Sequence, residues 1–209
     1  MLTSEQAVLL LQDAKSAKRR QGAKRLRVLA DRATAADVAD ALVKEFQDPR
    51  TWETQYQLVM ALGATGTSAQ VPMLQALATQ PRKATFVNAA LGDAVVRLGR
   101  ADVSDPAPLL WCLSQGVPQL DVGALRATAK LRLRLDESTV EDVLDHVDLQ
   151  DEDADRDVRF WTAVAAAGWQ GARVQGFLTT CTTSNLEILA EAARGALDGR
   201  YRDDLVADL

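Results

Sequence analysis

The chain has 209 residues, of which 47% are hydrophobic and 5% aromatic, and its formal net charge is −5. This hydrophobic content is ordinary for a globular domain, and abundant Ala and Leu beside few aromatic residues favour packed helices over sheets. No apolar run approaches the roughly 20 residues that a membrane-spanning helix requires. The first residues lack the small-residue cleavage site of a signal peptide, so they are predicted to form a helix of the fold.

The cysteine and histidine content predicts no cofactor. Cys112 and Cys181 are far apart in the sequence, and His146 is the single histidine. A structural zinc site needs about four such ligands at short spacing, and no CxxC pair is present. We therefore expect no metal or other cofactor and a reduced, cytoplasmic compartment.

Charge is distributed unevenly along the chain. Residues 1–35 contain eight Lys and Arg and three acidic residues, whereas residues 136–157 contain eleven Asp and Glu and a single Arg. The basic run from Lys15 to Arg32 could steer an acidic or phosphate-bearing partner to one end of the molecule. A solvated terminal helix is the preferred interpretation, because charge runs are usually solvated faces.

Helix-start signals recur at a nearly constant interval. Possible capping boxes begin at Thr3, Thr34, Thr67 and Ser138, where a hydroxyl can accept a hydrogen bond from an orphan amide. A Ser-Asp-Pro sequence at 104–106 and a glycine at 171 supply two further starts. The starts at 3, 34, 67, 104, 138 and 171 are spaced by 31, 33, 37, 34 and 33 residues, which indicates a repeat array.

A second helix is predicted inside each interval. Proline or acidic residues open it, and Leu-Gly or a similar sequence closes it, since glycine readily takes the left-handed conformation after a helix. The LRLRL sequence at 131–135 alternates like a strand, but it continues a helical pattern and is predicted to be helical. The predicted openings are at Pro49, Pro81, Pro118, 153–157 and 184–187, and the predicted stops are at 62–63, 98–99, 135–136, 168 and 197–199.

These patterns predict an all-α fold in which about six helical hairpins stack into a right-handed α-solenoid. One hairpin cannot bury its apolar face alone, so each depends on its neighbours. No linker rich in Pro, Gly or Ser divides the chain, which favours one continuous domain over residues 1–209. The expected repeats are about 3–33, 34–66, 67–103, 104–137, 138–170 and 171–209.

Two stretches resemble the second helices of HEAT repeats, especially the bacterial phycobilisome-lyase-like kind. The two stretches are residues 48–66 and 153–169. The family pattern has Asp, then Val-Arg, then alanines and Leu-Gly, and residues 157–159, 168 and 61–63 match it. The sequence departs from it at 54–55 and 90–91, where Thr-Gln and Ala-Leu replace Val-Arg. The resemblance implies the solenoid fold, and it implies function only weakly because one fold hosts many functions.

The candidate binding residues form two groups on predicted second helices. Arg126, Lys130 and Arg134 have the i, i+4, i+8 spacing of one helix face, where they could bind an acidic ligand or pair with the carboxylates at 153–157. Intramolecular pairing is the simpler account. The second group joins aromatic residues to arginine, a combination typical of interface anchors. It comprises Arg50, Trp52, Tyr56, Arg159 and Trp161.

We predict a binding module that recognises another protein through its groove, as a scaffold, adaptor or inhibitor. No nucleophile, phosphate-binding loop or metal motif indicates an enzyme, and His146 is expected to be a surface residue. One alternative is a DNA binder resembling the alkylpurine DNA glycosylases with HEAT-like solenoids, with Trp161 and Asp157 as a lesion-site pair. The acidic segment 136–157 makes this alternative less favourable, because binding DNA requires concentrated Lys and Arg. A weaker alternative is a bilin lyase, which only the family resemblance suggests.

Overall fold

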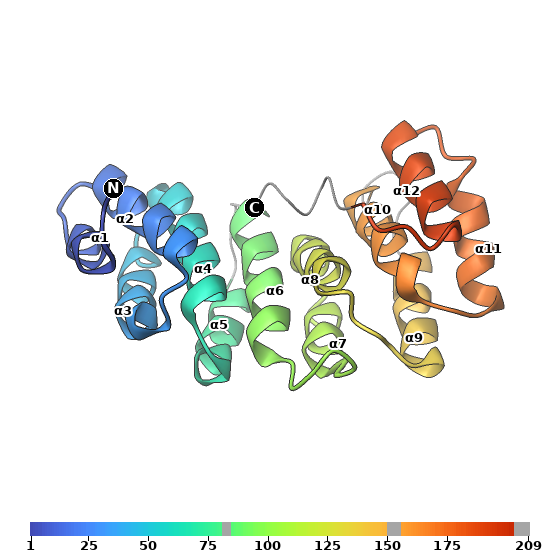
Figure 1. The fold of residues 1–209 in the computed structure, drawn as a ribbon, viewed down its shortest axis with the longest axis horizontal. Helices are drawn as coiled ribbons and strands as arrows, with labels where there is room; N and C mark the ends of the chain where they lie inside the picture. The colour runs from blue at the N-terminus through green and yellow to red at the C-terminus, as the bar shows by residue number, and fades with distance from the viewer. Residues whose placement is uncertain (81–84, 150–155, 203–209) are drawn as a thin grey trace. The chain divides into compact units, whose positions relative to one another are not determined.

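The computed structural model describes residues 1–80, 85–149 and 156–202 (Figure 1). These residues form twelve α-helices and four short 3-10 helices, and no strand occurs among them. The predicted all-α class is therefore confirmed. No helix in the described parts of the chain is long and apolar enough to cross a membrane.

The chain divides into two compact units, Met1–Gly99 and Arg100–Leu209. The prediction of one continuous domain stays a prediction. In the first unit, three helical hairpins pair α1 with α2, α3 with α4, and α5 with α6. Their second helices form a row in which α4 packs between α2 and α6 (Figure 1). The helices are α1 (Ser4–Leu11), α2 (Ser16–Leu29), α3 (Ala35–Glu45), α4 (Trp52–Thr65), α5 (Val71–Ala78) and α6 (Thr85–Gly99).

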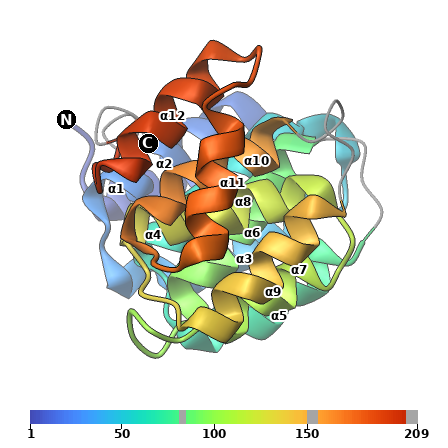
Figure 2. The same ribbon diagram turned by 90° about the vertical axis from the view of Figure 1, so that its right-hand side faces the viewer.

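The second unit repeats this arrangement. Its second helices α8, α10 and α12 form another row, and α7 and α11 pack against α8 and α12 (Figures 1 and 2). Helix α9 contacts α7 and α11, which places the three first helices in a layer of their own. Each unit is thus a two-layered, helical-repeat-like array. The helices are α7 (Ala107–Leu113), α8 (Pro118–Leu131), α9 (Glu137–Asp148), α10 (Arg156–Ala165), α11 (Ala172–Cys181) and α12 (Glu187–Leu197).

The core of each unit lies between its two layers of helices. Leu42 of α3 and Leu58 of α4 are fully buried, as the helical spacing of apolar residues predicts. Leu62, one turn beyond Leu58, is also fully buried, because α4 has neighbours on both sides. In the second unit, Leu120 and Leu125 of α8 are fully buried as well.

Several predicted helix boundaries agree with the structure. The amide of Gln6 donates to the Thr3 hydroxyl at 3.3 Å while the Gln6 side chain accepts from the Thr3 amide at 3.1 Å, which completes a capping box. The same arrangement occurs at Thr67. Gly171 precedes α11 with φ at +117°, and α6 and α12 end at their predicted stops. The predicted opening at Pro81 and most of segment 153–157 lie outside the described residues.

Other predicted caps are wrong because a nearby aspartate takes the role of the hydroxyl. Asp136 caps α9 and accepts from the Thr139 amide at 2.8 Å, so Ser138 lies inside the helix. Thr34 makes no side-chain cap, and Asp31 accepts from the Ala33 amide instead. A carboxylate is the stronger acceptor for orphan amides at a helix N-terminus.

Two predicted helix ends are also wrong. Helix α4 continues past Gly63 to Thr65, and it ends at Gly66, whose amide donates to the Leu62 carbonyl at 2.7 Å. Helix α8 ends at Leu131, and Arg132 has the left-handed conformation with φ at +51°. The LRLRL segment therefore leaves the helix after its first residue and does not continue it.

A close approach of α1 to α2 at Gly22 yields a prediction about stability. A Cβ atom added at Gly22 would lie 2.6 Å from the Ala7 carbonyl oxygen and 3.0 Å from the Leu10 Cβ atom. We expect Gly22→Ala to lower the free energy of unfolding by about 1–3 kcal/mol through overpacking, as measured by thermal or urea denaturation.

The matched control is Gly176→Ala in α11, because no atom lies within 4 Å of a Cβ built there. Alanine has the higher helix propensity, so this variant is expected to gain about 0.5–1 kcal/mol. Equal responses of the two variants would contradict the close approach at Gly22.

Candidate functional site

An exposed pair of aromatic rings lies on the first unit. The ring centroids of Trp52 and Phe86 are 6.2 Å apart and the ring planes differ by 22°, so the rings are stacked. Trp52 is 38% exposed and Phe86 is 66% exposed. Trp52 begins α4 and Phe86 follows the first residue of α6, the helix packed beside α4. We call Trp52 and Phe86 the aromatic pair. Phe86 was not among the predicted binding residues.

The other two predicted anchors of this unit lie close to Trp52 in the chain. Tyr56 is half-buried one turn further along α4. Arg50 lies in the 3-10 helix Pro49–Thr51, and its side chain is 87% exposed. Its guanidinium donates two hydrogen bonds to the Asp48 carboxylate, at 2.9 and 2.8 Å. These bonds lower the pKa of Asp48 to about 2. The charge of Arg50 is thus balanced within its own turn.

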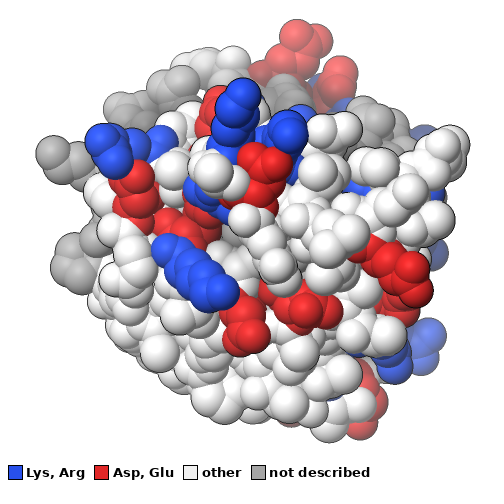
Figure 3. Space-filling model, turned by 90° about the vertical axis from the view of Figure 1, so that its left-hand side faces the viewer, with Lys and Arg blue, Asp and Glu red and all other residues white. Residues whose placement is uncertain are grey.

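Residues of the N-terminal basic run contact acidic groups of the same unit. Arg19 binds both oxygens of Glu45, which is 5% exposed, at 2.6 and 2.9 Å. Arg20 pairs with Glu53, the residue after Trp52. Figure 3 shows the side of the molecule that is on the left in Figure 1, where Lys and Arg side chains lie beside Asp and Glu side chains. The basic run therefore ties α2 to α3 and α4, in addition to contacting solvent.

The predicted stripe of three basic residues is wrong as a single helix face. Arg126 is 9% exposed within α8, and Lys130 is half-buried. Arg134 is exposed but lies beyond the end of α8, where its amide donates to the Val103 carbonyl at 2.7 Å. The i, i+4, i+8 spacing aligns residues only while the helix continues. The proposed partners at 153 and 155 lie outside the described residues.

The predicted anchors on α10 belong partly to the packing of the second unit. Arg159 and Trp161 are both half-buried. The Trp161 ring lies edge-to-face with Phe160 at a centroid distance of 5.1 Å and an interplanar angle of 70°. Asp157, which the glycosylase alternative pairs with Trp161, is exposed in the first turn of α10.

His146 differs from its prediction as a surface residue. Its Nε2 atom lies 2.9 Å from the Oδ2 atom of Asp121, a carboxylate that is 1% exposed in α8. This contact joins α9 to α8.

The buried Cys112 thiol is not a candidate nucleophile. Burial, and secondarily the charge of Asp121, raises the pKa of this thiol well above its usual range. The thiol therefore stays protonated, and a protonated thiol is a poor nucleophile. No group of three or more His, Cys, Asp and Glu among the described residues could hold a metal ion.

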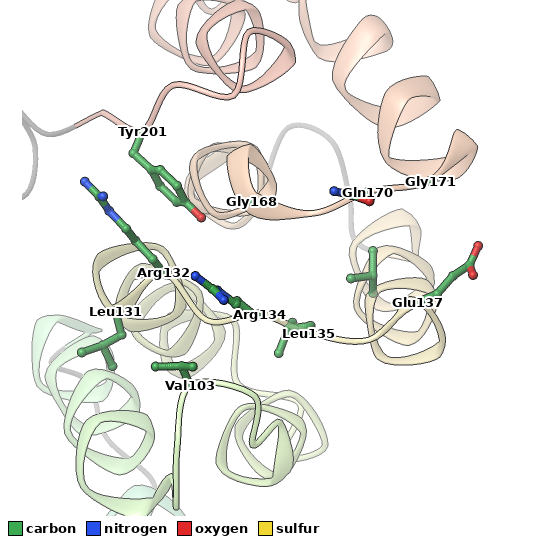
Figure 4. A pocket seen from close by; sticks show the side chains of 11 residues that line it. Val103, Leu131, Arg132, Arg134, Leu135, Glu137, Gly168, Gln170, Gly171 and Tyr201 are labelled. Atoms are coloured by element: carbon green, nitrogen blue, oxygen red, sulfur yellow. The ribbon is translucent and has the colours of Figure 1, made fainter.

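A pocket of about 1140 Å³ lies in the second unit, at the end of α8 (Figure 4). Arg132, Arg134 and Tyr201 line one side of it, and Figure 4 shows the Tyr201 hydroxyl close to Gly168. Only Arg134 of these residues was predicted as a binding residue.

No protein-family model and no curated protein matches this chain. Among solved structures, the chain is similar to an engineered protein determined by the Northeast Structural Genomics Consortium. The TM-score is 0.51 at 16% sequence identity, and the match covers 95% of this chain and 98% of the other. At this identity the likeness concerns the fold alone, and it agrees with the helical-repeat-like arrangement.

The Asp48–Arg50 pair yields a prediction about titration. We expect the Asp48 carboxyl to titrate at about 2 in the native protein, as followed by carbon NMR of its side chain. Arg50→Gln removes the largest cause of the lowered pKa, so the pKa should rise toward the ordinary value of 3.8. Because the native pKa is depressed, the contribution of the pair is complete above the unfolded-state pKa and is lost as pH falls through about 2.

Asp136 provides an internal control for this titration. The pKa of Asp136 is lowered chiefly by a hydrogen bond from the Thr139 backbone amide, which Arg50→Gln does not touch. A shift of both carboxyl groups in the variant, or of neither, would contradict the local origin of the Asp48 pKa.

Proposed function

We propose that this chain is a protein-binding module that recognises another protein through the surface around the aromatic pair. The observation that carries the proposal is that Trp52 and Phe86 stack in an exposed position on neighbouring second helices. Large rigid aromatic rings supply much binding energy with little loss of conformational entropy, and Trp is among the residues most enriched at binding hot spots.

The charges near the aromatic pair indicate the kind of partner. Arg50 is paired with Asp48, and Arg20 is paired with Glu53 beside Trp52. An apolar centre with a polar rim is the usual anatomy of a protein interface. We infer a partner segment that places an apolar side chain against the aromatic pair and polar groups against these ion pairs.

The finer architecture belongs to the same proposal. The row of second helices in each unit supports a right-handed solenoid of about six HEAT-like hairpins, and the residues around Asp157 and Gly168 support membership of the phycobilisome-lyase-like HEAT family. A scaffold, adaptor or inhibitor acting in the cytoplasm accords with such a module. The residues of the second unit that this function would use are the half-buried Arg159 and Trp161.

The charges around the aromatic pair do not favour the nucleic-acid alternative. A DNA binder requires a surface of concentrated Lys and Arg, whereas Arg19, Arg20 and Arg50 are each paired with a carboxylate. Retention on DNA at low salt that weakens steeply with added salt would replace our proposal by the nucleic-acid one. Covalent attachment of a bilin to an acceptor protein, followed by absorbance, would replace it by the lyase one.

The proposal is tested by comparing which proteins bind to wild type and to a Trp52→Ala/Phe86→Ala double variant. We expect wild type to capture a partner from native lysate and the double variant to lose it. Calorimetry with the purified partner should show a loss of affinity of at least tenfold, since hot-spot truncations cost about 2 kcal/mol or more. Trp52 fluorescence should shift when the partner covers the ring.

The matched control is Val43→Ala on α3, which removes another exposed apolar side chain of the same unit. It should retain the partner. Equal binding by wild type and the double variant, with both proteins folded by circular dichroism, would contradict the role of the aromatic pair.

A further inference from the structure

We propose that the pocket in the second unit is a binding site for a small organic anion, a carboxylate or phosphate carried on an apolar body. We call it the arginine pocket and define it by Arg132, Arg134, Tyr201 and Gln170 together with its apolar lining. The proposal is independent of the proposed protein-binding function, which rests on the first unit.

The backbone holds both arginines of the pocket in place. The amide of Leu133 donates to the Thr128 carbonyl at 3.1 Å, and Leu133 itself is 1% exposed. This anchors the segment after α8 while Arg132 takes the left-handed conformation. The hydrogen bond from the Arg134 amide to Val103 fixes the next turn of chain. Both arginines, on either side of the buried leucine, line the pocket. Figure 4 shows the Arg132 side chain beside the Tyr201 ring and the Arg134 side chain nearer the Tyr201 hydroxyl.

The pocket offers donors that match an oxyanion. Arg134 is exposed and makes no ion pair with any residue that the structure describes. The Arg132 guanidinium lies 4.8 Å from the centre of the Tyr201 ring, an arrangement that stacks cation on aromatic face. Guanidinium groups bind carboxylate and phosphate through paired hydrogen bonds, which gives such a site its chemical preference.

The Tyr201 hydroxyl completes the donor set. Burial raises the pKa of Tyr201, whereas the charges of Arg132 and Arg134 act in the opposite direction. The phenol therefore stays protonated at neutral pH and can donate a hydrogen bond. Gly168 lies against the hydroxyl so closely that a methyl group there would overlap it. The ring is thus held by contact on one side and by Arg132 on the other.

The remaining lining suits the body of a small molecule. Val103, Leu131, Leu135 and Val140 give the pocket apolar walls, and its volume of about 1140 Å³ slightly exceeds the roughly 300–1,000 Å³ of most small-molecule sites. Glu137 is the carboxylate on the rim. In Figure 4 it lies on the opposite side from Arg132, so it leaves the anion to the arginine side.

The test is isothermal titration calorimetry of the full chain with phenyl phosphate, benzoate and the neutral analogue benzyl alcohol, in buffer free of phosphate. We expect the two anions to bind at least tenfold more tightly than benzyl alcohol, because charge-assisted hydrogen bonds account for the difference. Preference for phenyl phosphate identifies a phosphate ester as the ligand class, and preference for benzoate identifies a carboxylic acid.

Two variants remove one charge each without disturbing the backbone. Arg134→Gln changes an exposed side chain, and Arg132→Asn keeps a residue that tolerates the left-handed conformation. Each should weaken anion binding by about tenfold and leave benzyl alcohol binding unchanged. The matched control is Arg194→Gln, an exposed arginine of α12 outside the pocket lining, which should bind the anions as wild type does.

Several results would overturn the proposal. They are the absence of anion binding to wild type, equal affinity for benzyl alcohol, or unchanged affinity in a folded Arg134→Gln variant. An equal loss in Arg194→Gln would also overturn it, because that result would assign binding to net charge and not to the pocket.

Discussion

Burial of apolar side chains on both sides of the second helices is the constraint on which each unit depends. Helix α4 packs between α2 and α6, and Leu58, Val59 and Leu62 are fully buried as a result. A hairpin alone would leave one of these surfaces in water, at a cost of about 25 cal/mol for each Å² of apolar area exposed. Neighbouring hairpins therefore stabilise one another, and the row of second helices is the common core.

Buried polar side chains of α4 also hold the helices of the first unit together. Thr54 and Gln55 of α4 are both almost fully buried. The Thr54 hydroxyl lies 2.7 Å from that of Ser16, and the Gln55 amide donates to the carbonyls of Glu45 and Asp48 at 3.1 and 2.8 Å. These bonds join α4 to α2 and α3. Buried polar groups must find partners, and these two side chains find theirs on the neighbouring helices.

The aromatic pair and the arginine pocket both lie at the ends of helices, where the regular packing of helix against helix stops. The rings of Trp52 and Phe86 stack in an exposed position at the N-terminal ends of adjacent helices. The arginine pocket begins where α8 stops early and the chain turns outward through Arg132. Ends of helices leave side chains and backbone free of the regular packing, which is why binding residues concentrate there.

The sequence by itself determined the helical class, most hairpin positions and several caps, because apolar spacing and capping residues act over a few residues. It also identified Trp52 and Arg134 as candidate binding residues. Only the tertiary structure showed that Trp52 stacks on Phe86 and that Arg126 is buried within α8. It also showed that His146 contacts Asp121, and that one pocket is lined by Arg132, Arg134 and Tyr201. These contacts join residues far apart in the chain or depend on where α8 ends. Local patterns do not encode them, since packing between helices decides which partner a side chain meets.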